Sequence, residues 1–386
     1  MLETLQQFNR LASIVPSRET AAPYIVKAIR AKHGFLEFFA GSGLVAEGFS
    51  GKFTPLWAND NCAKKADVYS ANHGKRHFQL GSIESIQGEC LPVAPLAWAS
   101  FPCQDLSLAG LTDGIHASRS GLVWEWLRVI DEMPSRPKIL VAENVTGLVS
   151  LNGGAHYRIL HEALVERGYR VGAMLINAEL WIPQSRPRIF IVAIVEKACL
   201  PSSLTGTVPN WLHTSSIIRA CDSLKDWIWW NLPLPPQRKI SLEDIVEWDA
   251  MPQDDETQKR NLALISPRHA KLLEMLPHNK PFAAPGYKRT RNGHQVLELR
   301  FDHIAGCLRT PQGGSSRQLL VLINSGHLVC RLLTVREAAR LMGAPDSYKL
   351  PGSYNDGYKA MGDGVAVPVT QWLAKHLLLP LVEAND

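Results

Sequence analysis

The sequence predicts an α/β fold, in which a parallel sheet carries helices on both faces and a smaller, irregular domain follows. Two observations predict this fold. Short apolar runs alternate with helical patterns through the first half of the 386-residue chain, and such alternation is typical of a parallel sheet. After residues 189–195 the alternation stops, and a stretch rich in Pro and Trp begins.

The expected strands are short apolar runs bounded by turn-forming residues. They are residues 35–39, 54–58, 95–100, 138–144 and 189–195. Helical spacing marks residues 63–72 and 121–133 between them. Because ligands bind at the carboxyl ends of parallel strands, we expect the functional residues where these runs end.

The region from 199 to 318 has weak periodicity and an uneven charge distribution. Residues 241–258 hold seven acidic and no basic residues, whereas residues 259–317 hold eleven Lys or Arg and three acidic residues. Helical patterns return at 334–343 and 366–382. We expect the last of these helices to pack against the sheet.

The composition is that of a soluble globular protein, with 46% hydrophobic and 20% charged residues. The net charge of +5 permits a nucleic-acid partner without requiring one. No apolar run reaches the roughly 18 residues of a membrane helix, and the N-terminus lacks a signal-peptide pattern. We therefore expect a cytoplasmic protein without membrane association. The seven cysteines include no CxxC pair, which indicates a reducing compartment and no metal site.

Polar turns follow the first two expected strands. Residues 39–44 read FAGSGL, and Gly41 and Gly43 allow a tight turn that brings backbone N–H groups close to a ligand. The second run leads into Asp60, whose carboxylate is placed to accept hydrogen bonds from ribose hydroxyls. An ordinary strand-to-helix turn and helix capping by Asp60 or Asn61 remain alternatives. Together the two features indicate a cofactor that contains a nucleoside.

Cys103 follows a proline at the end of the third expected strand, in SFPCQDLS (100–107). A cysteine at a strand end is most often a small buried hydrophobic residue. Pro102 stiffens the approach, however, and this strand end opens toward the expected cofactor site. A reachable and reactive thiol is therefore the other interpretation.

Glu143 ends the next strand, in AENV (142–145). Buried glutamate is rare without a partner or a task. Arg186 and Arg188 enter the last strand at alternate positions, so both can point to one face. For either arginine, a structural salt bridge to Glu143 is the alternative to a functional role.

Three motifs follow the FAGSG turn in a fixed order: PCQ (102–104), ENV (143–145) and QSRPR (184–188). This set resembles the DNA cytosine-5 methyltransferases. Residues 331–348 resemble the ninth motif of that family, and residues 362–369 resemble its tenth. The resemblance covers nearly the whole chain except 196–305, where the family carries its variable target-recognition region.

The resemblance implies a Rossmann-like methyltransferase sheet with helices on both faces and a smaller target-recognition domain. Residues 1–197 would form the catalytic, cofactor-binding domain. Residues 198–353 would read DNA, and residues 354–386 would return to the catalytic domain. The implied reaction is methyl transfer from S-adenosylmethionine to carbon 5 of a cytosine that is flipped out of double-stranded DNA.

Four residues are identified as catalytic by this resemblance. Cys103 would add to carbon 6 of the base as a thiolate. Glu143 would contact N3 and the exocyclic amine as a proton donor, which requires a raised pKa. Arg188 would hold O2, and Arg186 would support the cysteine loop. The loop from Gln104 to Arg119 would cover the flipped base.

The resemblance also assigns binding residues. The cofactor would be held by Phe39, Gly41, Gly43, Asp60, Ile83, Pro102 and Val365. DNA would be contacted by Gln104, Arg119, Lys288, Arg289, Arg291, Arg309 and Arg317, and no metal is expected. A cognate restriction enzyme is an expected companion, and we expect a monomer.

Three positions depart from the family pattern. Ser82 stands where the family often has an Asp for the adenine amine, and Asp363-Gly364 replaces Asn followed by Ser or Ala. Cys307-Leu308 replaces a Thr-Leu pair of the recognition region. Two alternatives remain: an RNA methyltransferase of the same chemistry, and a catalytically silent DNA-binding regulator. The RNA branch carries a Cys-Phe-Thr signature, against which this chain offers only CLRT (307–310).

Overall fold

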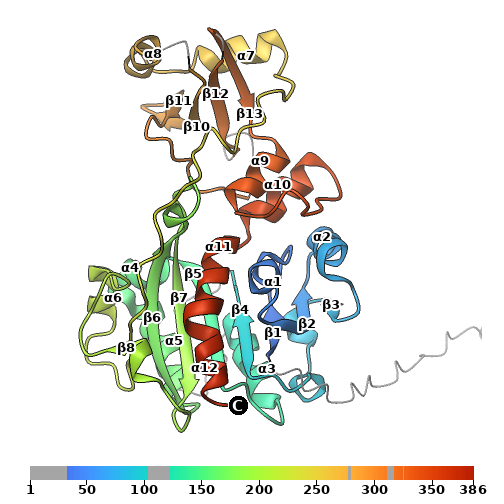
Figure 1. Cartoon of the computed structure of the whole chain (residues 1–386), viewed down its shortest axis with the longest axis vertical. Coiled ribbons are helices and arrows are strands. Elements are labelled where there is room, and N and C mark those ends of the chain that lie inside the picture. The colour runs from blue at the N-terminus through green and yellow to red at the C-terminus, as the bar shows by residue number, and fades with distance from the viewer. Residues whose placement is uncertain (1–32, 103–120, 277–279, 311–316, 325) are drawn as a thin grey trace, which may run out of the picture.

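The computed structural model describes residues 33–102, 121–276, 280–310, 317–324 and 326–386. These residues form a seven-stranded sheet, a separate four-stranded sheet and a two-stranded ladder. Figure 1 shows the large sheet in the lower part of the molecule and the small sheet at the top. Helices α9 (Val335–Leu341) and α10 (Tyr354–Gly362) lie between them.

The large sheet has the spatial order β3-β2-β1-β4-β5-β7-β6. In chain order its strands are β1 (Gly34–Phe38), β2 (Thr54–Asp60), β3 (Phe78–Leu80), β4 (Leu96–Ala99), β5 (Ile139–Val145), β6 (Tyr169–Asn177) and β7 (Pro187–Val195). The helices that connect or flank them are α1 (Leu44–Phe49), α2 (Ala63–His73), α3 (Leu122–Glu132), α4 (Gly147–Ser150) and α5 (Ala155–Val165). The expected apolar runs correspond to β1, β2, β4, β5 and β7.

The expectation of a purely parallel sheet is wrong at β7. This strand pairs antiparallel with both β5 and β6, whereas the other neighbours in the sheet pair in parallel. The reason is the short connection between β6 and β7. Only residues 178–186 separate the two strands, and a parallel pair needs a crossover of a dozen or more residues.

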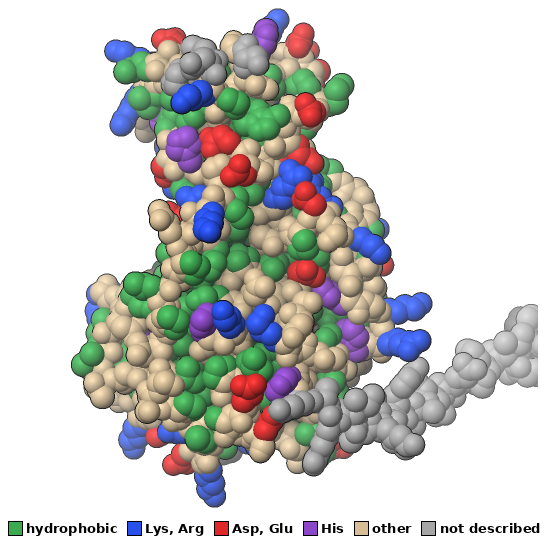
Figure 2. Space-filling view, in the orientation of Figure 1, with side chains coloured by type: hydrophobic (Ala, Val, Ile, Leu, Met, Phe, Trp, Pro, Cys, Tyr) green, Lys and Arg blue, Asp and Glu red, His purple; other side chains and the backbone are tan. Residues whose placement is uncertain are grey.

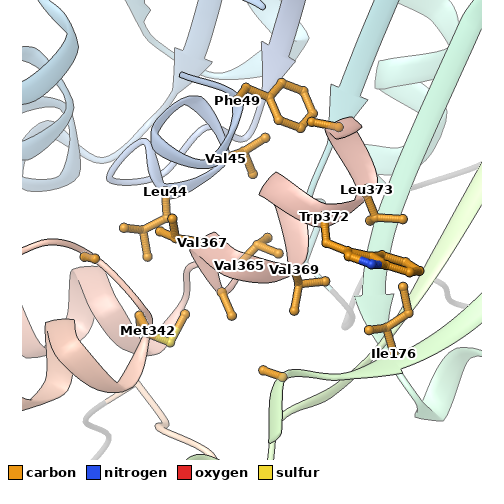
Figure 3. Close-up of a cluster of buried hydrophobic side chains, with 14 of the residues drawn as sticks. Leu44, Val45, Phe49, Ile176, Met342, Val365, Val367, Val369, Trp372 and Leu373 are labelled. Atoms are coloured by element: carbon orange, nitrogen blue, oxygen red, sulfur yellow. The ribbon is translucent and has the colours of Figure 1, made fainter. Parts of the chain in front are cut away.

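The C-terminal segment covers one face of the large sheet (Figure 1). It comprises α11 (Val367–Leu373), a π-helical turn at Ala374–Leu378 and α12 (Leu379–Glu383). Figure 3 shows its apolar side chains, among them Val367 and Trp372, packed with residues of α1 and β6. The apolar pattern of residues 366–382 predicted a helix that packs against the sheet, and the structure confirms it.

One stretch, Tyr354–Glu383, has the length and the mean hydropathy, 1.3, of a membrane span. Such a stretch was not expected from the sequence. However, 67% of its most apolar window is buried inside the protein. Burial of this kind is ordinary for a core helix, because a helix that packs on a sheet must also be apolar.

The small sheet has the order β11-β10-β12-β13, and its neighbours are all antiparallel. The strands are β10 (Phe282–Arg291), β11 (His294–Leu299), β12 (Leu319–Asn324) and β13 (His327–Leu332), with α7 (Asp255–Leu262) and α8 (Pro267–Glu274) nearby. Leu273 of α8 packs with apolar residues of all four strands in a separate core. This part of the chain is therefore more regular than the irregular domain that the sequence predicted.

The segment after β7 packs with the large sheet. Leu204, Leu212 and Trp230 belong to one core of that sheet, and Ile217 belongs to the other. The sequence placed the start of the second domain at residue 198. We propose instead that the second unit starts after residue 232, because β6 makes backbone hydrogen bonds to the segment before that point: Val171 to Asp226 and Ile228 at 2.8 and 2.9 Å, and Leu175 to Leu212 at 2.8 Å.

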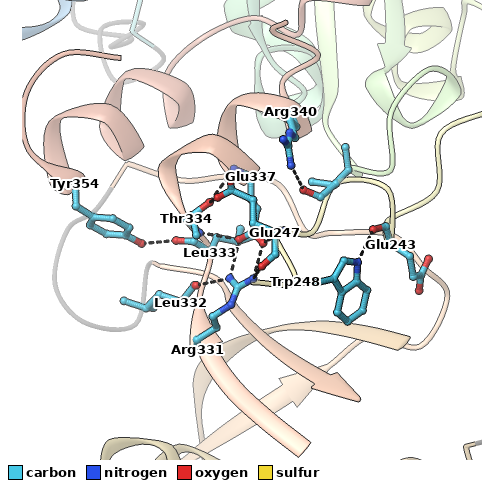
Figure 4. A network of polar contacts seen from close by, with 11 residues as sticks. Glu243, Glu247, Trp248, Arg331, Leu332, Leu333, Thr334, Glu337, Arg340 and Tyr354 are labelled. Atoms are coloured by element: carbon cyan, nitrogen blue, oxygen red, sulfur yellow. Dashed lines mark hydrogen bonds and ion pairs between the residues drawn. The ribbon is translucent and has the colours of Figure 1, made fainter. Parts of the chain in front are cut away.

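A buried polar network joins the small sheet to α9 (Figure 4). Arg331 at the end of β13 and Glu337 of α9 form a two-pronged ion pair with distances of 2.8 and 2.6 Å. Glu337 also accepts from the backbone N–H of Thr334 at 2.7 Å and of Glu247 at 2.7 Å. Since Arg331 is only 2% exposed and Glu337 0%, removal of one partner would leave the other charge buried and unpaired.

Candidate active site

The carboxyl ends of β4 and β5 lie side by side, because Ala99 pairs with Ala142 in parallel register. Asn144, just beyond Glu143, donates from its side-chain amide to the backbone carbonyl of Phe101 at 3.0 Å. Cys103 itself, like Gln104 and Arg119, lies outside the described residues. The chain that leads to Cys103 is nevertheless fixed beside Glu143, and Pro102 is exposed there.

Glu143 and Arg188 form an ion pair, with 3.2 Å between Oε1 and Nε. Antiparallel pairing of β5 and β7 brings the two residues together, since Val145 is opposite Arg188. Burial raises the pKa of the Glu143 carboxyl, although Arg188, Arg186 and a hydrogen bond from Ser100 oppose the shift. The salt bridge between Glu143 and Arg188, which the sequence offered as an alternative, therefore exists. The pKa of the Glu143 carboxyl is raised, as a proton donor requires.

Arg186 is 2% exposed and binds backbone carbonyls that are far away in the sequence. Its guanidinium donates to the carbonyl oxygens of Leu308 at 3.2 Å, Gly362 at 2.9 Å and Gly364 at 2.6 Å. Burial and the neighbouring Arg188 lower the pKa of Arg186 to about 10, which leaves it charged at neutral pH. Among the described residues, Arg186 therefore fastens the second unit and the tenth motif to the large sheet.

Cys307 lies against both arginines. Its Sγ is 3.4 Å from Nη1 of Arg186 and 3.7 Å from Nη2 of Arg188. Arg186 and Arg188 therefore point to one side of β7, as their alternate spacing predicted. The sequence marked Cys307 only as a departure from a Thr-Leu pair, because nothing in the local sequence shows which distant side chains it meets.

The turn after β1 and the end of β2 are tied together by Asp60. Its two carboxylate oxygens accept from the backbone N–H of Gly41 and of Cys62, each at 2.9 Å. Cys62 is the N-terminal capping residue of α2, and no side chain caps this helix, so the helix-capping interpretation of Asp60 is wrong and its bond to Cys62 is a local turn. Asp60 is 8% exposed, so its carboxylate is also a fixed part of the turn.

The glycines of this turn differ in what they allow. Gly41 has φ +57°, and a Cβ there would meet only the Lys65 side chain, at 4.0 Å. The space above Gly41 is thus open for a ligand to approach the backbone. Gly43 has φ +86°, and a Cβ there would strike His73 at 2.6 Å. Gly43 is required for packing on α2, and Phe39, with φ +55°, completes this tightly curved turn.

The remaining expected cofactor residues lie at the same edge of the sheet. Ile83 follows β3 and is 2% exposed, and Val365 is 3% exposed beside α11. A Cβ on Gly364 would lie 2.5 Å from Cδ1 of Leu44, so the leucine fills the room that a larger residue at 364 would need. This contact gives a physical reason for one of the three departures.

Asp363 forms contacts that the sequence did not predict. Its carboxylate is 2.7 Å from Nζ of Lys65 on α2, and Thr310 donates a hydrogen bond to it. Burial lowers the pKa of the Lys65 ammonium, but Asp363 and Asp60 outweigh this and raise it. Asp363 therefore connects the tenth motif to α2, next to the expected cofactor residues, and to the segment 307–310 that contains Cys307.

The basic residues expected to face DNA divide between two faces of β10. Lys288 is half-buried, and burial together with nearby Arg260 lowers the pKa of its ammonium. Arg289 points with Tyr287 to the opposite face, since side chains alternate along a strand. Its guanidinium lies 5.3 Å from the Tyr287 ring centroid. Lys288 and Arg289 therefore lie on opposite faces of β10, and the DNA contacts expected of Lys288, Arg289 and Arg291 stay predictions.

The face of β10 that carries Tyr287 continues toward the candidate site. The Tyr287 hydroxyl donates to the carbonyl of Cys307 at 2.7 Å, and the Arg309 guanidinium lies 5.7 Å from the Tyr287 ring. Arg291 pairs with Glu298 at 2.6 Å. Arg317 donates to Asn355 at 2.6 Å. On the side of the molecule seen in Figure 2, Lys and Arg are interspersed with Asp and Glu.

Comparison with known proteins decides the family. The family model described as C-5 cytosine-specific DNA methylase matches residues 34–378. The chain belongs to this family. The methylase is therefore a DNA (cytosine-5-)-methyltransferase, as the motifs predicted.

Named relatives agree with this assignment. The methylase is 26% identical to the type II methyltransferase M.Bsp6I of Bacillus sp. (strain RFL6) over 346 residues, which cover 88% of this chain and 96% of the relative. It is 25% identical to M.HhaI of Haemophilus parahaemolyticus over 350 residues, covering 89% and 93%.

Solved structures support the Rossmann-like methyltransferase fold. The structure of S. pombe Dnmt2 methyltransferase matches with a TM-score of 0.58 and 17% identity, over 91% of this chain and 98% of that one. A putative DNA modification methyltransferase of an E. coli prophage matches with a TM-score of 0.53 and 17% identity, over 89% and 97%. At this level of identity the likeness concerns the fold alone.

Proposed function

We propose that the methylase transfers a methyl group from S-adenosylmethionine to carbon 5 of a cytosine flipped out of double-stranded DNA, through a covalent adduct with Cys103. The observation that carries the proposal is the buried Glu143–Arg188 pair, 3.2 Å apart, beside a Phe101 backbone held by Asn144. It supports a site that grips a planar polar base next to the cysteine loop.

The described residues fit the cofactor. The open space above Gly41 is a cradle that a side chain would fill, and the Asp60 carboxylate lies directly behind it. When bound, S-adenosylmethionine supplies a methyl group on a positively charged sulfur. The residues that would hold it are Phe39, Gly41, Gly43, Asp60, Ile83, Pro102 and Val365.

The chain's own groups prepare the base. The Cys103 thiolate adds to carbon 6, which makes carbon 5 electron-rich. Glu143 in its protonated form donates to N3 as negative charge develops in the ring, and its raised pKa keeps that proton available. Arg188 donates to O2. After methylation, a base such as water takes the carbon-5 proton, the freed electron pair forms the double bond between carbons 5 and 6, Cys103 leaves as a thiolate, and N3 returns its proton to Glu143.

The second unit would hold the duplex while the base leaves its stack, which costs a few kcal/mol. Arg289 and Arg309 flank Tyr287 on the face that leads to Cys307. We assign the phosphate contacts to this face. Lys288, Arg291 and Arg317 are already involved in local burial or pairing, and Gln104 and Arg119 of the loop over the base stay predictions. A companion restriction enzyme and a monomeric state stay predictions as well.

Covalent trapping tests the proposal. A duplex amplified with the 5-fluoro analogue in place of dCTP presents fluorinated targets in every sequence context. With S-adenosylmethionine present, the wild-type protein should form a denaturation-resistant complex with it, because fluorine at carbon 5 cannot leave as a proton does. Cys103→Ser should form none, while a matched Cys90→Ser variant, at an exposed thiol, should trap like wild type. Trapping by Cys103→Ser would remove Cys103 from the mechanism.

A further inference from the structure

Cys307 has an environment unlike that of the other described cysteines. Its sulfur lies within 3.4 Å of Arg186 Nη1 and 3.7 Å of Arg188 Nη2. Arg186 is almost fully buried, and its Nε has no hydrogen-bond partner among the described residues. Two guanidinium groups therefore converge on one sulfur in a place where little water screens their charge.

We propose that Cys307 is a second reactive thiolate of the methylase, held between Arg186 and Arg188 and open to modification by soft electrophiles such as peroxide. The site itself does not depend on the proposed function. Only the consequence for base binding rests on that function, through Arg188.

The charges around the sulfur favour its ionised form. Burial raises the pKa of the Cys307 thiol. The combined lowering by Arg186, Arg188 and Arg309 is larger than this increase, so the net pKa is below the ordinary value. The phenols of Tyr287 on β10 and Tyr358 on α10 also face it, and both remain neutral at ordinary pH. Glu143 pairs with Nε of Arg188 at 3.2 Å, whereas Cys307 contacts Nη2 of the same guanidinium.

Two other cysteines provide an internal contrast. Burial raises the pKa of both Cys221 and Cys330 to about 11. Neither is surrounded by converging guanidinium groups as Cys307 is. Cys307 is also partly exposed, whereas Cys221 and Cys330 are buried. Because the thiolate is the nucleophilic form, these differences predict selective reaction at Cys307.

Oxidation of the Cys307 thiolate by hydrogen peroxide requires no other reactant. The thiolate sulfur attacks one oxygen of hydrogen peroxide, an S–O bond forms and the O–O bond breaks. The products are a sulfenic acid on Cys307 and hydroxide, with sulfur oxidised by two electrons and peroxide reduced by two. The added oxygen has to occupy space between the two arginines, so we expect it to move Arg188 away from Glu143.

Site-resolved alkylation tests this inference. The full-length protein is treated with limiting iodoacetamide from acidic to alkaline pH, and the alkylation of each cysteine is followed by peptide mass spectrometry. The variants are Arg188→Gln, the milder Arg309→Gln at an exposed position, and the control Arg300→Gln. Arg300 pairs with Asp302, so the control removes the same charge from the same segment.

We expect the alkylation of Cys307 to reach half its plateau at a lower pH than that of Cys221 or Cys330. Arg188→Gln and Arg309→Gln should move this midpoint to higher pH. Where the midpoint lies above neutral pH, the alkylation rate at neutral pH should fall about tenfold for each further pH unit by which it rises. Arg300→Gln should leave the midpoint unchanged. After peroxide treatment, a sulfenic-acid probe should label Cys307 but not Cys330.

Two results would overturn the inference: a Cys307 midpoint no lower than that of Cys330, or a midpoint that neither Arg188→Gln nor Arg309→Gln moves. The measurement needs neither DNA nor methyl donor. Failure of the thiolate site is therefore distinguishable from failure of the proposed methyl transfer, which the trapping experiment reports separately.

Discussion

Asp60 already has two hydrogen-bond donors before any ligand binds, the backbone N–H groups of Gly41 and Cys62. Each of these bonds stabilises the fold by about 1 kcal/mol. They also hold the carboxylate in one orientation. The residue therefore shapes the turn and, in our proposal, meets the ribose with the lone pairs that remain.

Asp60→Ala should weaken donor binding strongly, because it removes the ribose acceptor and loosens the Gly41 turn. Calorimetric titration with S-adenosylhomocysteine measures the affinity, and chemical denaturation measures the accompanying loss of stability. Asp60→Asn is the matched control, since it keeps one oxygen acceptor and should bind with intermediate affinity. Equal donor affinity in all three proteins would remove Asp60 from the cofactor site.

Glu143 combines a raised pKa with an ion pair to Arg188. A carboxyl whose folded pKa is raised contributes stability below the unfolded pKa, and that contribution is lost as pH rises through the folded value. Glu143→Gln lacks this titration. Its unfolding free energy relative to wild type should therefore increase from acidic to neutral pH, as measured by denaturation at each pH.

The same substitution should reduce the methylation rate by about 10²- to 10⁴-fold, the usual contribution of a general acid. In the wild type, the rate of base addition should fall as pH rises through the raised pKa of Glu143. A stability difference that does not change with pH would show that Glu143 ionises at its ordinary pKa. It could then not serve as the proton donor at neutral pH.

At the scale of elements, the side-chain alternation of β10 decides which basic residues can meet DNA. Arg289 shares a face with Tyr287 and Arg309, whereas Lys288 points toward α7 and Arg260. The sequence analysis listed Lys288, Arg289 and Arg291 together as DNA contacts, because charge counts carry no information about which face of a strand a residue occupies. Pro285 and Gly286 are uncommon inside strands, so β10 was not predicted from the sequence. The turn that follows it, Asn292-Gly293 with φ +50° and +79°, is a common hairpin turn and was a signal for this strand pair.

Arg289→Ala should weaken duplex binding and reduce the slope of log affinity against log salt by about 0.9, the value for one phosphate contact. Lys288→Ala, one position away on the other face, is the matched control and should leave the slope unchanged. Fluorescence anisotropy over a salt series measures both. Equal slopes for the two variants would mean that the Tyr287 face does not carry the phosphate contact.

In the whole molecule, the first half of the chain forms the large sheet and the last segment, which is helical, covers one face of it. The apolar runs predicted β1, β2, β4, β5 and β7, and the order of motifs predicted the family. The direction of β7 and the packing of residues 204–232 were not predictable, because they depend on connection length and on contacts across the sheet.

Some contacts of the candidate site were also predictable from the sequence, and others were not. Glu143 and Arg188 were expected near each other, since both lie at strand ends of one sheet. The partners of Arg186 were not expected, because they are backbone carbonyls more than a hundred residues away. Every residue has a backbone carbonyl, so the sequence does not indicate which ones a distant arginine will bind. The Lys65–Asp363 pair is likewise visible only once the tenth motif lies against α2.

Bisulfite sequencing of a plasmid from cells that express the methylase tests the proposed cytosine methylation without any knowledge of the target sequence. We expect cytosines protected from conversion at one recurring sequence in the wild type, and none with Cys103→Ser expressed at the same level. Full conversion with the wild-type protein, or equal protection with the Cys103→Ser variant, would contradict the proposed methyl transfer through Cys103.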